Sequence, residues 1–117
     1  MKLLFFAALL PVMVACAPTI GDKCERSSQC GTTLSCDTTI AQGYCLKVGC
    51  RQGECPAEAA CIDFGGDTRF CMRHCAVDNE CRDDLLCRPV PLCSDVSAAS
   101  APAPCSMEKS QLFCGSK

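Results

Sequence analysis

Apolar residues gather in the first fifteen positions of this chain and become sparse beyond them. Lys2 precedes a predominantly apolar run over residues 3–14. A run of about a dozen residues is shorter than the ~20 that a membrane-spanning helix needs, and a basic residue before it is typical of a secretory signal. We therefore predict that residues 1–15 are a signal peptide.

Past the leader, cysteines stand where bulky apolar residues stand in ordinary domains. The 117 residues include 15 cysteines, and the aromatic residues after Cys16 are Tyr44, Phe64, Phe70 and Phe113. So few large side chains make a small core, and each disulfide adds about 2–4 kcal/mol to the free energy of unfolding. Disulfides persist in oxidising compartments, which indicates the periplasm or the cell exterior.

The cysteine spacing repeats along the chain in three units, over about residues 24–49, 50–74 and 75–114. The residue before the second cysteine of each unit is an acid or an amide: Gln29, Glu54 and Glu80. The residue before the fourth cysteine is aromatic: Tyr44, Phe70 and Phe113. The repeat predicts a small disulfide-rich fold of tandem short β-hairpin and loop units with little helix.

Fourteen cysteines follow Cys16, an even number that allows seven disulfides. Spacing alone leaves three pairings open within each four-cysteine unit. We favour first-to-third and second-to-fourth pairing, because the third and fourth cysteines flank a hairpin pattern and the first half of the unit would lie across both strands. The cysteines predicted to form disulfides are Cys24, Cys30, Cys36, Cys45, Cys50, Cys55, Cys61, Cys71, Cys75, Cys81, Cys87, Cys93, Cys105 and Cys114.

The hairpin pattern is clearest in the second unit, between Cys61 and Cys71. Gly65-Gly66 at its centre supplies the positive φ values that a two-residue hairpin turn requires. Earlier in the unit, Pro56 predicts the start of a single helical turn through residues 57–60.

The third unit reaches its fourth cysteine only at Cys114, after an insertion over residues 88–113. The insertion carries Cys93 and Cys105, which we expect to pair with each other. Residues 94–104 between them are rich in Ser, Ala and Pro and predict a flexible loop without packed structure.

Residues 13–16, Met-Val-Ala-Cys, resemble the lipobox of bacterial lipoproteins, with Met13 where leucine is usual. The resemblance implies cleavage before Cys16, a thioether-linked diacylglycerol on its sulfur and an acylated amino terminus. Several acyl chains together anchor a protein stably in a membrane. Because Ala17 follows instead of aspartate, the sorting rule of such lipoproteins implies the outer membrane. Residues 16–23 are then the lipidated cysteine and a short tether.

Cleavage after Ala17 is the alternative, since residues 15–17 have the small-x-small form of an ordinary cleavage site. It would place Pro18 just past the scissile bond, where a missing N–H and a fixed φ make a poor substrate. That alternative predicts a secreted protein without a lipid.

Metal binding is disfavoured, and no metal or cofactor is predicted. The chain contains no C-x2-C pair, and His74 is its single histidine, which we expect on the surface between the second and third units. The acids of residues 78–80 and 83–84 lack the spacing of an EF-hand loop and predict a solvated turn.

Residues 88–92, Arg-Pro-Val-Pro-Leu, predict a stiff extended connector. Arg88 is also a candidate specificity residue of a protease inhibitor, but Pro89 directly after it disfavours that role. No G-x-S-x-G motif occurs, so we predict no catalytic residue and no enzyme activity. The net charge of −2, with acids and bases interleaved, predicts no nucleic-acid partner.

The C-x5-C-x5-C units, such as Cys24-Glu25-Arg26-Ser27-Ser28-Gln29-Cys30, resemble those of cysteine-rich secreted and lipid-anchored proteins of myxobacterium-like Gram-negative bacteria. The units at Cys24 and Cys75 are also loosely similar to the amino-terminal cysteine-rich region of animal Dickkopf proteins. Both resemblances imply a stapled extracellular module used in binding.

Taken together, these patterns predict a lipid-anchored cell-envelope protein with a disulfide-stapled binding or structural module. Its expected partners are the membrane, through the lipid, and a protein that the sequence does not identify. The alternative is a secreted disulfide-rich ligand or protease inhibitor.

Overall fold

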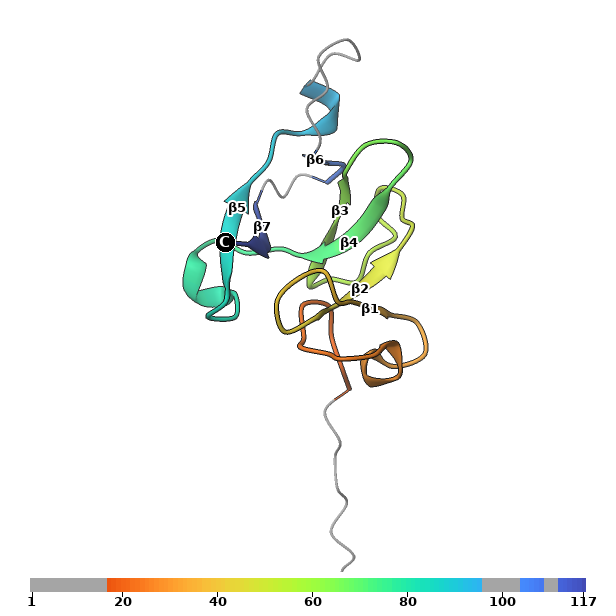
Figure 1. Ribbon diagram of the computed structural model, residues 1–117. Coiled ribbons are helices and arrows are strands. Elements are labelled where there is room, and N and C mark those ends of the chain that lie inside the picture. Colours follow the sequence, from red (N-terminus) through yellow and green to blue (C-terminus); the bar gives the residue numbers. More distant parts are fainter. Residues whose placement is uncertain (1–16, 96–103, 109–111) are drawn as a thin grey trace, which may run out of the picture.

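The computed structural model describes residues 17–95, 104–108 and 112–117 (Figure 1). The predicted signal peptide, Cys16 and most of the predicted flexible loop lie outside these residues. The strands are β1 (Ser35–Asp37), β2 (Tyr44–Val48), β3 (Ala59–Asp63), β4 (Arg69–Arg73), β5 (Leu85–Pro89), β6 (Cys105–Ser106) and β7 (Leu112–Ser116). The helical segments of the described residues are the short 3₁₀ turns η1 (Ser27–Cys30), η2 (Asp78–Glu80) and η3 (Cys93–Asp95).

The strands form a five-stranded sheet, in the order β1-β2-β4-β3-β6, and a two-stranded ribbon of β5 and β7. All of these strand pairs are antiparallel. The first unit supplies β1 and β2, the second supplies β3 and β4, and the third supplies β5 and β7 (Figure 1). The predicted fold class, a small disulfide-rich protein of short hairpins with little helix, is confirmed.

The third and fourth cysteines of each unit are direct cross-strand partners. The pairs of opposite residues are Cys36 and Cys45, Cys61 and Cys71, and Cys87 and Cys114. Each hairpin therefore presents two sulfur atoms to the loop that precedes it.

That loop carries the first and second cysteines of the unit, and the disulfides run from it to both strands. The bonds are Cys24–Cys36, Cys30–Cys45, Cys50–Cys61, Cys55–Cys71, Cys75–Cys87, Cys81–Cys114 and Cys93–Cys105. The order within each unit is first-to-third and second-to-fourth, as the repeat predicts. The Cα atoms of the first-to-third pairs are 5.9 Å apart in all three units, so the same frame is built three times.

The predicted tether over residues 16–23 is shorter than expected, because its second half belongs to the folded module. The side chain of Ile20 is fully buried in the core. Gly21 N–H donates to the Cys45 carbonyl (2.8 Å), and Cys45 N–H donates to the Asp22 carbonyl (2.9 Å). Residues 20–22 thus lie along β2, where these hydrogen bonds and the buried Ile20 side chain hold them.

The turn between β3 and β4 is longer than the predicted two-residue turn. Gly65, Gly66 and Asp67 all have positive φ, and Phe64 N–H donates to the Thr68 carbonyl (2.8 Å) outside them. The glycine pair supplies the positive φ values as expected, but Asp67 joins them, so the loop gains a residue.

The predicted helical turn after Pro56 is wrong. Ala59 N–H donates to the Pro56 carbonyl (2.9 Å), which closes a β-turn, and Ala59 is already the first residue of β3. The pairing of Ala59 with Arg73 takes this segment into the sheet, and the strand ladder outweighs the helical preference of the alanines.

The insertion of the third unit is attached to the second unit. Its strand β6 pairs with β3, through Ile62 with Ser106 and Asp63 with Cys105. Met107 N–H also donates to the Cys61 carbonyl (2.9 Å). The insertion therefore starts at the ribbon of the third unit and returns along the edge of the main sheet.

Candidate functional site

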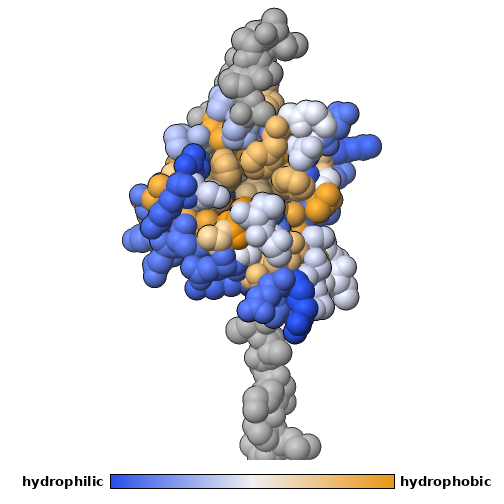
Figure 2. Space-filling view, viewed as in Figure 1, coloured by the Kyte–Doolittle hydropathy of each residue, from blue (hydrophilic) through white to orange (hydrophobic). Residues whose placement is uncertain are grey.

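A concave surface with a mainly apolar lining lies between the three units. This interunit cleft has a volume of about 840 Å³, and every unit contributes to its walls. Figure 2 shows apolar residues gathered near the centre of this face, with hydrophilic residues toward its edges. The cleft is within the size range of binding sites for small ligands and peptide segments.

The floor of the cleft comes from the strands. Leu46 of β2, Met72 of β4 and Phe113 of β7 line it, and each is less than 5% exposed. Alternate side chains of a strand lie on the same face. In each of these strands, that face carries an apolar side chain that lines the cleft. The floor is thus part of the hydrophobic core.

One aromatic contact lies within the second unit at the cleft, and another joins the second unit to the third. The Phe64 ring lies 5.6 Å from Phe70 and 6.1 Å, edge to face, from Phe113. Phe70 and Phe113 are the aromatic residues that precede the fourth cysteine in their units. Their counterpart in the first unit, Tyr44, is instead fully buried and accepts a hydrogen bond from Arg73 N–H (2.9 Å).

Burial also affects the acidity of Tyr44. Desolvation raises the pKa of its phenol to about 12, although the hydrogen bond from Arg73 and the nearby Arg82 charge act in the opposite direction. The phenol is therefore neutral at physiological pH, and it holds the first unit against the second.

The wall on the side of the third unit is formed by residues 88–91. Pro89 and Pro91 are exposed, whereas Val90 between them is buried. The predicted extended connector is thus partly strand, since Arg88 and Pro89 are the last residues of β5. Proline fixes φ and has no N–H, so this wall is stiff and poor in backbone donors.

Charged groups stand at two places on the cleft lining. Arg88 is exposed, and its Nε donates to the Ser116 carbonyl. Asp37 lies at the end of β1, where its Oδ1 accepts hydrogen bonds from the Thr39 N–H (2.9 Å) and hydroxyl (2.6 Å). The lining therefore combines an apolar floor with one cation and one anion.

The relative placement of the first and third units depends on Arg82. Its Nη1 donates to the Gly43 carbonyl (2.7 Å), and its Nη2 donates to Asp84 (3.0 Å). The guanidinium also lies 5.8 Å from the centre of the Tyr44 ring. Burial acts to raise the pKa of Asp84, but its hydrogen bonds, above all with Arg82, hold the pKa below its usual range.

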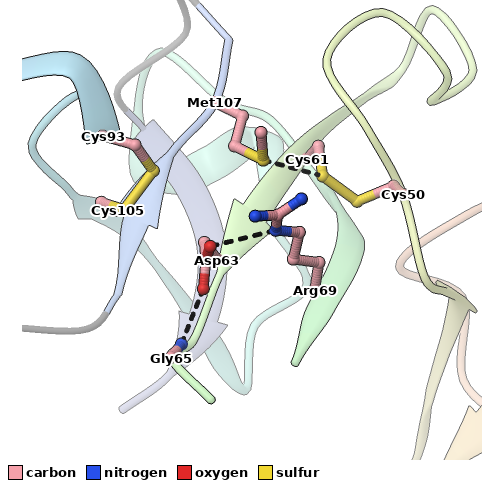
Figure 3. Close-up of polar contacts among 8 residues, drawn as sticks. All are labelled: Cys50, Cys61, Asp63, Gly65, Arg69, Cys93, Cys105 and Met107. Atoms are coloured by element: carbon pink, nitrogen blue, oxygen red, sulfur yellow. Dashed lines mark hydrogen bonds and ion pairs between the residues drawn. A yellow bond between two sulfur atoms is a disulfide. The ribbon is translucent and has the colours of Figure 1, made fainter. Parts of the chain in front are cut away.

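The loop over the cleft on the second unit is ordered by Asp63, as Figure 3 shows. Asp63 accepts hydrogen bonds from Gly65 N–H (2.8 Å) and Arg69 Nε (3.0 Å). The Gly65 hydrogen bond is the main reason why the pKa of Asp63 is lower than usual, and Arg69 adds to it. Met107 packs its sulfur 3.8 Å from Cys61 Sγ in the same view.

The acid or amide before each second cysteine has one repeated contact. Its side chain accepts the backbone N–H of the residue that follows the first cysteine of the unit. The three pairs are Gln29 with Glu25 (2.6 Å), Glu54 with Arg51 (3.1 Å) and Glu80 with Ala76 (3.1 Å). The repeat at this position is thus a structural cap on the loop, and the sequence signal gave no hint of that role.

The acids of the third unit also cap backbone groups. Asp78 accepts Cys87 N–H (2.8 Å), as Ser27 accepts Cys36 N–H (3.0 Å) at the same place in the first unit. Residues 78–80 and Asp83 are exposed, in agreement with a solvated turn, whereas Asp84 is half-buried in its ion pair with Arg82. His74 is exposed as predicted, and its Nε2 lies 2.8 Å from the Ala57 carbonyl oxygen.

Three groups of cysteine sulfurs lie close enough together for metal ligands: Cys24, Cys30 and Cys36; Cys50, Cys55 and Cys61; and Cys75, Cys81 and Cys114. Every one of these sulfurs belongs to a disulfide. A metal takes the thiolate form of cysteine, so the oxidised protein offers no ligand at these groups.

Arg88 does not stand in a free loop. It pairs with Phe113 across the ribbon, and the neighbouring Cys87 is bonded to Cys75 instead of Cys93. The substrate-like geometry of a protease-inhibitor loop requires an unpaired, exposed segment, and the backbone of Arg88 is engaged in the β5–β7 ladder.

Among the residues that the structure describes, no helix has the length and apolarity that crossing a membrane requires. No protein-family model matches the chain, and neither a curated protein nor a solved structure matches it. The seven disulfides indicate an oxidising location, extracellular or periplasmic.

Proposed function

We propose that the protein is a lipid-anchored outer-membrane protein whose disulfide-rich module binds an extended apolar peptide segment of a protein partner. The interunit cleft is the binding site in this proposal, and Cys16 is the point of attachment to the membrane. The observation that carries the proposal is an apolar cleft built jointly by three units, each of which is stapled by its own disulfides.

The anchor is supported by the sequence around Cys16 and by the cysteine count. The seven disulfides use all fourteen cysteines that follow Cys16, so no cysteine of the chain is left to pair with it. An unpaired cysteine in an exported protein calls for another partner or a modification. Lipidation after cleavage of the leader meets that requirement, and the resemblance to cysteine-rich lipoproteins points the same way.

Binding is supported by the apolar lining of the cleft. Phe64 and Phe70 are only half-buried there, and the prolines of residues 89–91 stand at its wall. When a ligand covers concave apolar surface that is in contact with water, the burial favours binding by about 25 cal/mol per Å² of apolar surface. The disulfides order each wall internally, and noncovalent contacts such as Arg82 with the Gly43 carbonyl hold the walls against one another, so little ordering entropy is lost on binding.

The choice of a peptide segment follows from the lining groups. An extended segment places apolar side chains on the floor at alternate positions and has a polar backbone for the edges. Arg88 and Asp37 carry opposite charges on that lining, which suits a segment with charges of both signs next to its apolar residues.

Site-specific photo-crosslinking in the envelope of a producing cell tests the proposal. A benzophenone amino acid replaces Ile40 or Pro91, which line the cleft from the first and third units, or the off-cleft control residues Val48 and Val77, which are 62% and 52% exposed. The proposal expects the same crosslinked protein from both cleft positions, with the crosslink mapped by mass spectrometry to an apolar segment, and none from the controls. Equal crosslinking at all four positions, or none at the cleft, would overturn it.

The secreted ligand or protease inhibitor is the alternative function. It separates from the proposal at Cys16, because a protein that diffuses away carries no lipid. The paired backbone of Arg88 lends the inhibitory version no support.

A further inference from the structure

The burial of Ile20 limits how far the module can stand from its anchor. Ile20 is fully buried, and Thr19 is tied to the module because its N–H donates to Asp22 Oδ2 (2.8 Å). Only Ala17 and Pro18 separate Cys16 from these fixed residues, and both are exposed. Three residue steps at about 3.5 Å each span about 10 Å.

This reach is close to the thickness of the lipid headgroup layer. A bilayer has a hydrocarbon core of about 30 Å and a total thickness of about 40–45 Å, which leaves about 5–8 Å of headgroups on each side. The acyl chains on Cys16 lie in the hydrocarbon, so its backbone sits at the inner edge of that layer. Thr19 must then lie at or just above the headgroup surface.

The first unit borders the point where the chain leaves the module. A side-chain carbon at Gly31 would lie 3.5 Å from Pro18, so the loop after η1 borders the exit. Figure 1 shows the described chain starting at the end of the molecule that the first unit forms, with η3 at the opposite end.

The charge of this end suits a bilayer surface. Residues 26–36 contain no carboxylate and include a series of Ser and Thr residues, and the exposed cations Lys23 and Arg26 stand on either side of the exposed Glu25. The exposed acids of η2 belong instead to the third unit. Hydroxyl groups and cations form hydrogen bonds with lipid phosphates, and the two cations Lys23 and Arg26 offset the charge of Glu25 that anionic lipids would repel.

We propose that the module rests on the lipid headgroups with the surface of residues 26–33, and that the interunit cleft opens sideways along the membrane. The proposal rests on the lipidation of Cys16 given above. In the common view of Figures 1 and 2, the apolar centre of the face looks toward the reader, across the direction in which the chain exits. A partner segment would therefore reach the cleft from beside the protein, within the layer next to the membrane.

Single tryptophan residues can report this orientation, because the chain has no Trp of its own. Ser28 in η1 and Ser94 in η3 are both exposed, so Ser28→Trp and Ser94→Trp form a matched pair at the two ends of the molecule. Each lipidated variant is inserted into vesicles of phosphatidylethanolamine and phosphatidylglycerol that carry a headgroup spin-labelled phospholipid. The intact mass of each variant first establishes the lipid and the disulfides.

The proposal expects the fluorescence of Ser28→Trp to fall at least two-fold on insertion, while that of Ser94→Trp stays within a tenth of its starting value. A flexible Gly-Ser linker of about ten residues, inserted between Ala17 and Pro18, lies outside the packed residues and should abolish the quenching at position 28. Equal quenching at both positions, quenching at 94 alone, or none at either in the lipidated protein would overturn the orientation. Absence of the lipid in the mass spectrum would instead overturn the proposed function.

Discussion

Arg82 of the third unit donates a hydrogen bond from Nη1 to the backbone carbonyl of Gly43 in the first unit, over 2.7 Å. The two residues are 39 positions apart in sequence, and both belong to loops. Disulfides staple each unit internally, yet no disulfide joins the first unit to the third. Noncovalent contacts such as this one therefore hold the first and third units in place around the interunit cleft.

Replacing Arg82 should lower the free energy of unfolding more than replacing an exposed arginine does. Arg82→Met removes the hydrogen bonds to Gly43 and Asp84 and leaves the Asp84 carboxylate, whose side chain is 16% exposed, without its cation. We expect a loss of about 2–4 kcal/mol in the free energy of unfolding. Urea unfolding of the oxidised protein measures it. The control Arg51→Met changes an exposed arginine and should stay within about 0.5 kcal/mol of the parent, and equal losses in both variants would refute the role of Arg82.

Gly43 should tolerate no side chain. Its φ is +71°, and a Cβ there would lie 1.8 Å from the Cys24 carbonyl oxygen, a backbone atom that cannot move aside. We expect Gly43→Ala to prevent correct oxidative folding, measured as the yield of the species with all disulfides formed. Gly53 is the matched control, since its φ is +81° but nothing lies within 4 Å of a Cβ. Gly53→Ala should cost only about 1–2 kcal/mol and keep the yield. Normal yield from Gly43→Ala would show that the loop packs differently.

The side-chain cap at Glu80 should depend on an acceptor and not on charge. Glu80→Ala removes the acceptor of the Ala76 N–H, and we expect a loss of about 1 kcal/mol in the free energy of unfolding. Glu80→Gln keeps an acceptor, as Gln29 does in the first unit, and should be close to the parent. If both variants lose the same stability, the charge of Glu80 and not its role as an acceptor would explain why the position matters.

Tyr44 should ionise far above the ordinary range of tyrosine. The folded-state pKa is about 12 and the unfolded value is about 10, so ionisation favours unfolding. The stability that this group contributes is therefore complete below pH 10 and is lost as the pH rises toward 12. Tyr44 is the single tyrosine, so tyrosinate absorbance during an alkaline titration reports it alone. A midpoint near 10 in the oxidised protein, the same as in the reduced unfolded chain, would contradict its burial.

The cysteine repeat was enough to predict the disulfide order, because each unit pairs its own cysteines, even where the insertion separates Cys81 from Cys114 by 33 positions. The third and fourth cysteines lie opposite each other on neighbouring strands, as Cys61 and Cys71 do, so spacing within one unit decides which sulfurs the preceding loop can reach. The fold class follows from the same repeat.

The interunit cleft and the docked tether could not be predicted in that way. The burial of Ile20 depends on one apolar residue among polar and turn-forming neighbours, which has no periodicity. The two-residue strand β6 is too short to give a pattern, although it closes the edge of the main sheet at Ile62. The cleft arises from the placement of separate units, and that placement rests on long-range contacts such as Arg82 with Gly43.

The intact, non-reduced mass of the mature protein from a Gram-negative host tests the central claim most directly. An anchored, fully stapled module predicts a chain that starts at Cys16, carries the mass of its acyl groups and is two hydrogens lighter for each of seven disulfides. A chain cleaved elsewhere and free of lipid would contradict the anchor and favour a secreted ligand, and a mass with free thiols would contradict the disulfide frame.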